Sequence, residues 1–252
     1  MKRTLTGMCT AAAIILLTAC AGPETKTGSD GQNDPAVANA NLGLAYMERG
    51  EYQVALDKLK KALEINPDLP QAHHYIAMVY QKLGNVGDAE KHFERAVSLD
   101  GSDSALQNNY GTFLFAEGRY KDAKKELQRA ADDPDYARRA QAFENLGLTE
   151  LKLDETDAAK ASFQRALLLN ASMPRSHLEL AQIEFSTGNF AAAKENFDRY
   201  NAMAKPTARS LWLGIRLSRV LHDQDQLASY ALALRNLFPD SEEYRLYQDR
   251  QW

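Results

Sequence analysis

The side chains that most often carry chemistry are sparse in this chain and do not form a catalytic set. Its histidines are His73, His74, His92, His177 and His222, and none belongs to a His-Glu-x-x-His zinc motif. The nucleophile elbow, the phosphate-binding loop and the glycine-rich dinucleotide motif are also missing from the sequence. We therefore expect a protein that is not an enzyme and that uses no metal, no cofactor and no small-molecule substrate.

The histidines fit a helical scaffold better than a metal site. His73 and His74 are adjacent, so on a helix their side chains point about 100° apart and do not easily reach the same ion. His73 and His177 occupy the same position of a repeat described below, where we expect them to pack, and His92 is expected on an outer helical surface. The acidic stretch at 132–136 lacks the ligand spacing of a calcium loop and is predicted to be a solvated turn.

The thiol of Cys20 is the side chain for which the sequence predicts a chemical modification. Two basic residues near the start of the chain precede an apolar stretch of about a dozen residues at 8–19. This stretch is shorter than the roughly 20 residues that span a bilayer, but it suits the apolar region of a secretory signal peptide. It ends in Leu-Thr-Ala-Cys at 17–20, which resembles the lipobox of bacterial lipoproteins.

The resemblance to a lipobox implies that residues 1–19 are a signal peptide and that Cys20 accepts a diacylglycerol. An ordinary signal peptide that happens to contain a cysteine is the alternative. Residues 20–33 would form the lipidated cysteine and a flexible tether, because 21–33 are rich in small polar and charged residues. Residue 21 is Ala rather than Asp, which by the sorting rule of such lipoproteins implies a lipid-anchored protein on the periplasmic face of the outer membrane.

The charge balance argues against nucleic acid as a partner. The chain has 30 basic and 34 acidic side chains, a formal net charge of −4, and no strongly basic segment. Nucleic-acid binding needs clustered lysines and arginines that neutralise phosphates. We expect the partners to be another protein and, through the lipid anchor, the outer membrane.

From residue 36 onward the sequence repeats with a period close to 34 residues. The predicted units are 36–69, 70–103, 104–137, 140–173, 174–207 and 209–242, and a C-terminal tail follows at 243–252. The eighth position of the first five units holds a small residue, namely Gly43, Ala77, Gly111, Gly147 and Ala181. The twentieth position holds alanine in all six units, ending with Ala228, and the twenty-fourth holds Leu or Phe, ending with Leu232.

Small residues at recurring positions allow two helices to cross closely, and the larger residue fills the space beside them. The pattern resembles the tetratricopeptide repeat, a helix-turn-helix unit of 34 residues. This resemblance implies an all-α fold, a right-handed superhelix of about six helix-turn-helix repeats over residues 34–242. Superhelices of this kind usually bind extended or helical peptides along their concave face.

The candidate binding surface is the concave groove, which the first helix of each unit lines with its second, fifth, ninth and twelfth residues. Leucine and methionine are frequent at the ninth and twelfth positions, which indicates a groove for a hydrophobic peptide or helix. The alternative is that these side chains pack against a neighbouring helix. In the sixth unit the same rule selects Ser210, Leu213, Leu217 and Val220.

The lipobox, the short tether and the six repeats together resemble the PilF/PilW family of type IV pilus biogenesis lipoproteins. The local stretches that carry this resemblance are 108–114, 143–148 and, most specifically, 209–217 (Arg-Ser-Leu-Trp-Leu-Gly-Ile-Arg-Leu). The resemblance implies a pilotin, which binds the pilus secretin in the periplasm and brings it to the outer membrane for multimerisation. A generic periplasmic repeat scaffold for cell-envelope assembly is the alternative.

The family resemblance also implies that the partner surface lies mainly in the N-terminal repeats. Among the groove positions of those repeats, it selects five partner-binding residues: Leu44, Met47, His74, Met78 and Phe115.

Overall fold

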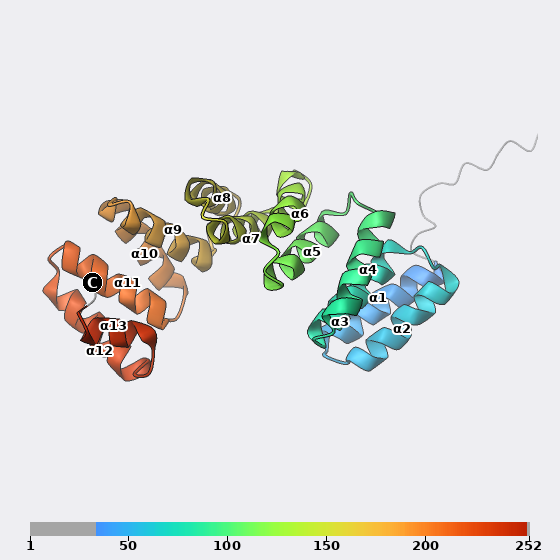
Figure 1. Cartoon of the computed structure of the whole chain (residues 1–252), viewed down its shortest axis with the longest axis horizontal. Coiled ribbons are helices and arrows are strands. Elements are labelled where there is room, and N and C mark those ends of the chain that lie inside the picture. Colours follow the sequence, from blue (N-terminus) through green and yellow to red (C-terminus); the bar gives the residue numbers. More distant parts are fainter. Residues whose placement is uncertain (1–33, 251–252) are drawn as a thin grey trace, which may run out of the picture.

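The computed structural model describes residues 34–250, and every regular element in this range is a helix. The helices form an arch, with α1 to α4 at one end, α5 to α8 across the top and α9 to α13 at the other end (Figure 1). The predicted signal peptide, Cys20 and the tether lie outside the described residues. None of the described helices combines the length and apolarity needed to cross a bilayer.

Twelve of the helices pair in chain order, each with its immediate neighbour. The pairs are α1 (Pro35–Glu48) with α2 (Tyr52–Ile65), α3 (Pro70–Lys82) with α4 (Val86–Leu99), α5 (Ser104–Ala116) with α6 (Tyr120–Asp132), α7 (Arg139–Lys152) with α8 (Thr156–Leu169), α9 (Pro174–Ser186) with α10 (Phe190–Met203), and α11 (Ala208–Val220) with α12 (Gln224–Leu237). In the middle of the arch, α6 and α8 lie along the outer edge while α5 and α7 lie nearer the inner curve (Figure 1). The expected all-α superhelix of six helix-turn-helix repeats is confirmed.

The tight turn inside each repeat requires one residue in the left-handed region of the backbone. Glycine supplies it in four repeats, for example Gly118 with φ +75°, because glycine has no Cβ to clash there. Asp154 (φ +61°) and His222 (φ +60°) occupy the equivalent place in the fourth and sixth repeats. In the fourth repeat, the amide of Glu155 still donates to the carbonyl of Glu150 at 2.9 Å, so the turn closes in the same way.

The paired helices cross where a small residue on the first faces a large one on the second. A Cβ added at Gly43 would stand 2.5 Å from Cγ of Leu59, and one added at Gly111 would stand 2.6 Å from Cγ of Leu127. Both leucines are fully buried. The recurring small residue is therefore required by the packing and is not a matter of composition.

The sixth repeat differs from its predicted frame by one residue. We expected Ala228 and Leu232 at the helix crossing, but Ala228 is exposed and Leu232 is 50% exposed. The buried residues of α12 are Ala231 and Leu234, and α11 contributes the fully buried Ile215 to the same cluster. The sizes are exchanged in this repeat, since the large side chain comes from the first helix and the small one from the second. An alignment of the repeats on their recurring alanine therefore places the start of this repeat one residue too late.

The C-terminal segment expected to be a tail contains a further helix, α13 (Glu242–Gln248). Ser241 caps its N-terminus, accepting a hydrogen bond from the amide of Tyr244 at 3.2 Å. Tyr244, Leu246 and Tyr247 pack against the cluster formed by α11 and α12. This helix covers the outer side of the last helix pair of the described chain, α11 and α12.

Candidate functional site

The five residues predicted to bind a partner gather at the joints between the first three repeats. Leu44, Met47 and Met78 belong to one apolar cluster, and Met78 and Phe115 pack against the next. Met47 (8% exposed) and His74 (3% exposed) are almost completely buried, so packing is their role in this structure. Leu44, Met78 and Phe115 are half-buried, and their contact with a partner stays a prediction.

His74 connects the second repeat to the third through a hydrogen bond. The side-chain amide of Asn109 donates to Nε2 of His74 at 2.9 Å and also approaches Sδ of Met78 at 3.6 Å. Burial lowers the pKa of His74 to about 4, although the charge of Asp103 opposes this shift. The imidazole is therefore neutral near pH 7 and acts as an acceptor in the floor of the groove.

Asparagines continue this polar connection along the first helices of the central repeats. Asn145 on α7 donates to Oδ1 of Asn108 on α5 at 3.1 Å, just as Asn109 joins α5 to α3. Asn108 is a predicted groove residue at the fifth repeat position, whereas Asn109 and Asn145 were not predicted, although both stand at the sixth position and that spacing was the available signal. Hydrogen bonds of this kind orient successive repeats, because a buried amide left unpaired is costly.

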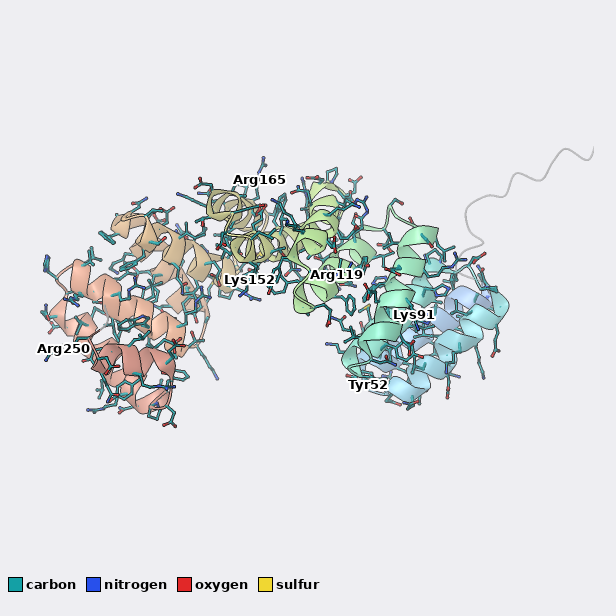
Figure 2. The ribbon with its side chains drawn as sticks, in the orientation of Figure 1. Tyr52, Lys91, Arg119, Lys152, Arg165 and Arg250 are labelled. Atoms are coloured by element: carbon teal, nitrogen blue, oxygen red, sulfur yellow. The ribbon has the colours of Figure 1, made fainter. Side chains whose placement is uncertain are left out.

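A small cavity opens in the groove beside Phe115. Its volume is about 200 Å³, and its lining combines apolar and polar side chains. They are Thr112, Phe115, Leu127, Asn145, Leu148 and Arg175. The outer surface differs in character, as Figure 2 shows for Arg165 on α8, which points into solvent away from the inner curve.

At the C-terminal end, charged side chains of both signs and an aromatic ring line the groove, contrary to the apolar lining that the predicted frame gives. Ser210, Leu213 and Leu217 are buried, because the repeat frame was set one residue too late. The residues that line a cavity on this part of the inner face include Arg209, Trp212 and Arg216.

The two arginines of this end are held in different ways. Arg209 donates two hydrogen bonds to Glu179, each 2.7 Å long. The guanidinium of Arg216 lies 4.2 Å from the ring centroid of Phe185, a cation–π contact, and burial lowers its pKa.

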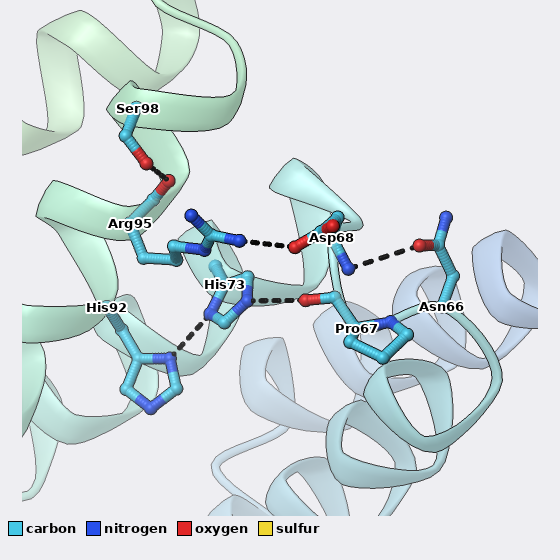
Figure 3. A network of polar contacts seen from close by, with 7 residues as sticks. All are labelled: Asn66, Pro67, Asp68, His73, His92, Arg95 and Ser98. Atoms are coloured by element: carbon cyan, nitrogen blue, oxygen red, sulfur yellow. Dashed lines mark hydrogen bonds and ion pairs between the residues drawn. The ribbon is translucent and has the colours of Figure 1, made fainter.

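Two histidines of the second repeat, His73 and His92, bond to each other, and His92, predicted on the outer surface, is half-buried by this contact. Nδ1 of His73 lies 3.0 Å from Nδ1 of His92, and Nε2 of His73 lies 3.0 Å from the carbonyl oxygen of Pro67 (Figure 3). A carbonyl only accepts, so Nε2 of His73 carries the proton and its Nδ1 accepts from His92. Burial, followed by the charge of His73, lowers the pKa of His92.

The fifth repeat has an asparagine, Asn196, in place of the second histidine, and its oxygen faces the ring of His177. Nδ1 of His177 lies 3.0 Å from Oδ1 of Asn196, and its Nε2 lies 3.2 Å from the carbonyl oxygen of Ala171. His73 and His177 therefore tie the entering loop to the second helix of their repeats, which agrees with the predicted packing role. No group of three or more potential ligands that could hold a metal ion is present between residues 34 and 250.

Models of the tetratricopeptide repeat match most of the chain, at residues 43–84, 76–138 and 144–205. Among curated proteins, the chain is 36% identical over 235 residues to the type IV pilus assembly protein PilF of Pseudomonas aeruginosa, which covers 92% of this chain and 93% of that protein. It is also 28% identical over 130 residues to an uncharacterised protein of Haemophilus influenzae, covering 52% of this chain and 73% of that protein.

Solved structures agree with these sequence relationships. The structure of Pseudomonas aeruginosa PilF superposes with a TM-score of 0.83 at 36% identity, over 87% of this chain and 99% of that one. The structure of PilW, described as a widely conserved type IV pilus biogenesis factor, superposes with a TM-score of 0.73 at 26% identity, over 86% of this chain and 99% of that one. The chain therefore belongs to the PilF/PilW family of tetratricopeptide-repeat proteins of type IV pilus biogenesis.

Proposed function

We propose that this protein is a pilotin, a lipid-anchored protein of the outer membrane that binds the type IV pilus secretin and promotes its localisation and multimerisation there. The observation that carries the proposal is the similarity to PilF over nearly the whole of both chains. The lipobox-like sequence that ends at Cys20 supports the membrane anchor. In this function the repeats recognise the partner and perform no catalysis.

The groove near Phe115 supports recognition of an apolar segment. Phe115 packs on one side against the core of the second and third repeats and also lines the groove cavity. Met78 is half-buried beside the same core, and its flexible thioether suits contact with partners of varied shape. A partner helix that buries one apolar residue against Phe115 and another against Met78 would use the helix-in-groove mode of recognition.

The decisive experiment compares strains in which the gene is deleted and then restored in different forms. We expect deletion to abolish secretin multimers, the wild-type gene to restore them, and Cys20→Ala to leave the secretin outside the outer-membrane fraction. Immunoblots of heat-resistant multimers and of membrane fractions measure these outcomes. Unchanged multimers after deletion would contradict the pilotin function and favour the envelope-scaffold alternative.

A second set of strains separates recognition from anchoring. Phe115→Ser is expected to reduce secretin co-purification while the protein remains in the outer membrane. The matched control is Leu168→Ser on α8, because Leu168 is 78% exposed and lies outside the apolar clusters of the described chain. Circular dichroism must show equal helicity in both variants. Equal co-purification of both with the secretin would exclude the Phe115 region as the contact surface.

A further inference from the structure

A second, larger cleft opens at the edge of the fourth repeat. Its volume is about 830 Å³, and it lies between segment 134–141, which leads into α7, and segment 169–175, which leads into α9. The first segment lies where the repeat spacing rises from 34 to 36 residues, so the longer loop supplies one wall. Apolar contributions come from Tyr136, Leu169 and Met173.

Each of the two segments brings an exposed arginine to the cleft, Arg138 on the first and Arg175 on the second. Within the described part of the chain, neither guanidinium has a carboxylate oxygen within ion-pair distance. Lys124 and Lys160 of the same repeats are paired, with Glu150 at 3.6 Å and with Glu184 at 2.9 Å. Arg138 and Arg175 differ from these cations in lining a cleft without an ion-pair partner.

The remaining charged residues of the cleft do not supply a partner for these arginines. Arg139 is fixed, because its Nε donates to the carbonyl of Ala131 at 2.7 Å and its guanidinium lies 5.4 Å from the ring centroid of Phe143. Glu144 accepts from the amide of Ser176 at 3.1 Å and from its hydroxyl at 2.6 Å. Three arginines and one carboxylate give the lining a charge of +2, within a chain of net charge −4.

Arg175 joins this cleft to the groove. It lines the 830 Å³ cleft and also the 200 Å³ cavity that contains Phe115 and Leu148. An occupant can therefore place an apolar side chain beside Phe115, a carboxylate on Arg175 and a second carboxylate towards Arg138. Guanidinium groups suit carboxylates, since two parallel N–H···O bonds form at once.

We propose that the cleft between 134–141 and 169–175 is a docking surface for an extended, acidic segment of a partner protein, in which carboxylate side chains flank an apolar one. The surface shares Phe115 with the proposed secretin contact, but Arg138 and Arg175 are not among the residues proposed to bind the secretin, so the two proposals can fail independently. Charge complementarity selects this occupant, because the arginines lack internal partners and the apolar wall excludes a purely ionic contact.

The test uses the full-length protein and a fluorescein-labelled peptide that alternates glutamate with leucine. Fluorescence anisotropy is expected to show saturable binding that weakens at least about tenfold in the double variant Arg138→Gln, Arg175→Gln. The same peptide with glutamine in place of glutamate is expected to bind at least about tenfold more weakly to the wild type. Both arginines are exposed, and circular dichroism is expected to show an unchanged fold.

A matched double variant controls for overall charge. Arg49→Gln with Arg235→Gln removes the same two charges from exposed sites in the first and sixth repeats and is expected to bind the glutamate peptide as the wild type does. Met78→Gln is also expected to bind it normally, because Met78 belongs to the proposed secretin contact and lines neither of the two cavities.

Three results would overturn the proposal. They are equal affinity for the glutamate and glutamine peptides, equal loss in the two double variants, or arginine-dependent binding to phosphatidylglycerol vesicles without binding to the peptide.

Discussion

At the scale of single residues, the protonation of His74 affects the stability of the joint between the second and third repeats. Its folded pKa of about 4 lies below the ordinary value of 6.5, so the folded state holds fewer protons than the unfolded chain between these values. The contribution of neutral His74 to the free energy of unfolding is therefore fully present above about pH 6.5, and it is lost as the pH decreases towards 4. The shift corresponds to about 3 kcal/mol in the free energy of unfolding.

We predict that His74→Gln makes the protein less sensitive to acid. Glutamine retains an acceptor for Asn109 but does not titrate, so the free energy of unfolding should fall about 2 kcal/mol less than in the wild type between pH 7.5 and 5. Urea denaturation at both pH values measures the difference. Parallel losses in the two proteins would show that His74 is not the group responsible.

The histidine bridge of the second repeat yields a prediction with a control already present in the chain. His92→Asn introduces the residue type that the fifth repeat has at Asn196, 3.0 Å from His177. An asparagine does not titrate, and its side-chain NH2 can donate to Nδ1 of His73 as His92 does. We expect the stability of His92→Asn at pH 7 to remain within about 0.5 kcal/mol of the wild type, whereas His92→Ala should lose about 1 kcal/mol. Equal losses in both variants, measured by urea denaturation, would contradict a hydrogen-bonding role.

At the scale of the helical elements, each turn inside a repeat requires one residue with a positive φ. Asp154 takes φ +61° where four other repeats have glycine. We predict that Asp154→Gly raises the free energy of unfolding by about 0.5–1 kcal/mol and that Gly118→Ala lowers it by about 1 kcal/mol. Thermal and urea unfolding test both changes. A neutral Gly118→Ala variant would show that the turn tolerates a Cβ in this conformation.

The sequence predicts the helix crossings correctly where a small residue of the first helix faces a large residue of the second. The prediction fails where these sizes are reversed. Gly43 facing Leu59 and Gly111 facing Leu127 are of the first kind. In the sixth repeat, Ile215 and Ala231 exchange the sizes, so an alignment on alanine moves the frame by one residue. Because of the same error, Arg216 was not predicted to lie on the inner face. The period of the sequence predicts how many helix pairs there are. The residue at which each repeat begins depends on contacts between its two helices.

The candidate site was less predictable than the fold, because burial of a groove position depends on the neighbouring repeat. His74 is buried at the joint with the third repeat, where Asn109, 35 residues later, donates to it. Met78 and Phe115 remain half-buried at the same joint. Helix α13 was missed because seven residues carry too little periodicity, although Tyr244 and Tyr247 pack it against the stack.

At the scale of the whole molecule, the arch separates an inner surface from an outer one. Phe115 lines a cavity of the groove, whereas Lys91 lies on α4 (Figure 2). The side chain of Lys91 is 77% exposed. A rigid stack of repeats carries such a surface without rearrangement, because each repeat is held by its neighbours. We therefore expect partner contact on the inner surface.

Site-specific photo-crosslinking in living cells tests this assignment most directly. A photoreactive amino acid is placed at position 115 or, as the matched outer control, at position 91, and adducts are identified by immunoblotting and mass spectrometry. We predict an adduct with the type IV pilus secretin at position 115 and none at position 91. An adduct at position 91 alone, or no secretin adduct at position 115 in cells that assemble normal multimers, would contradict recognition of the secretin by the groove.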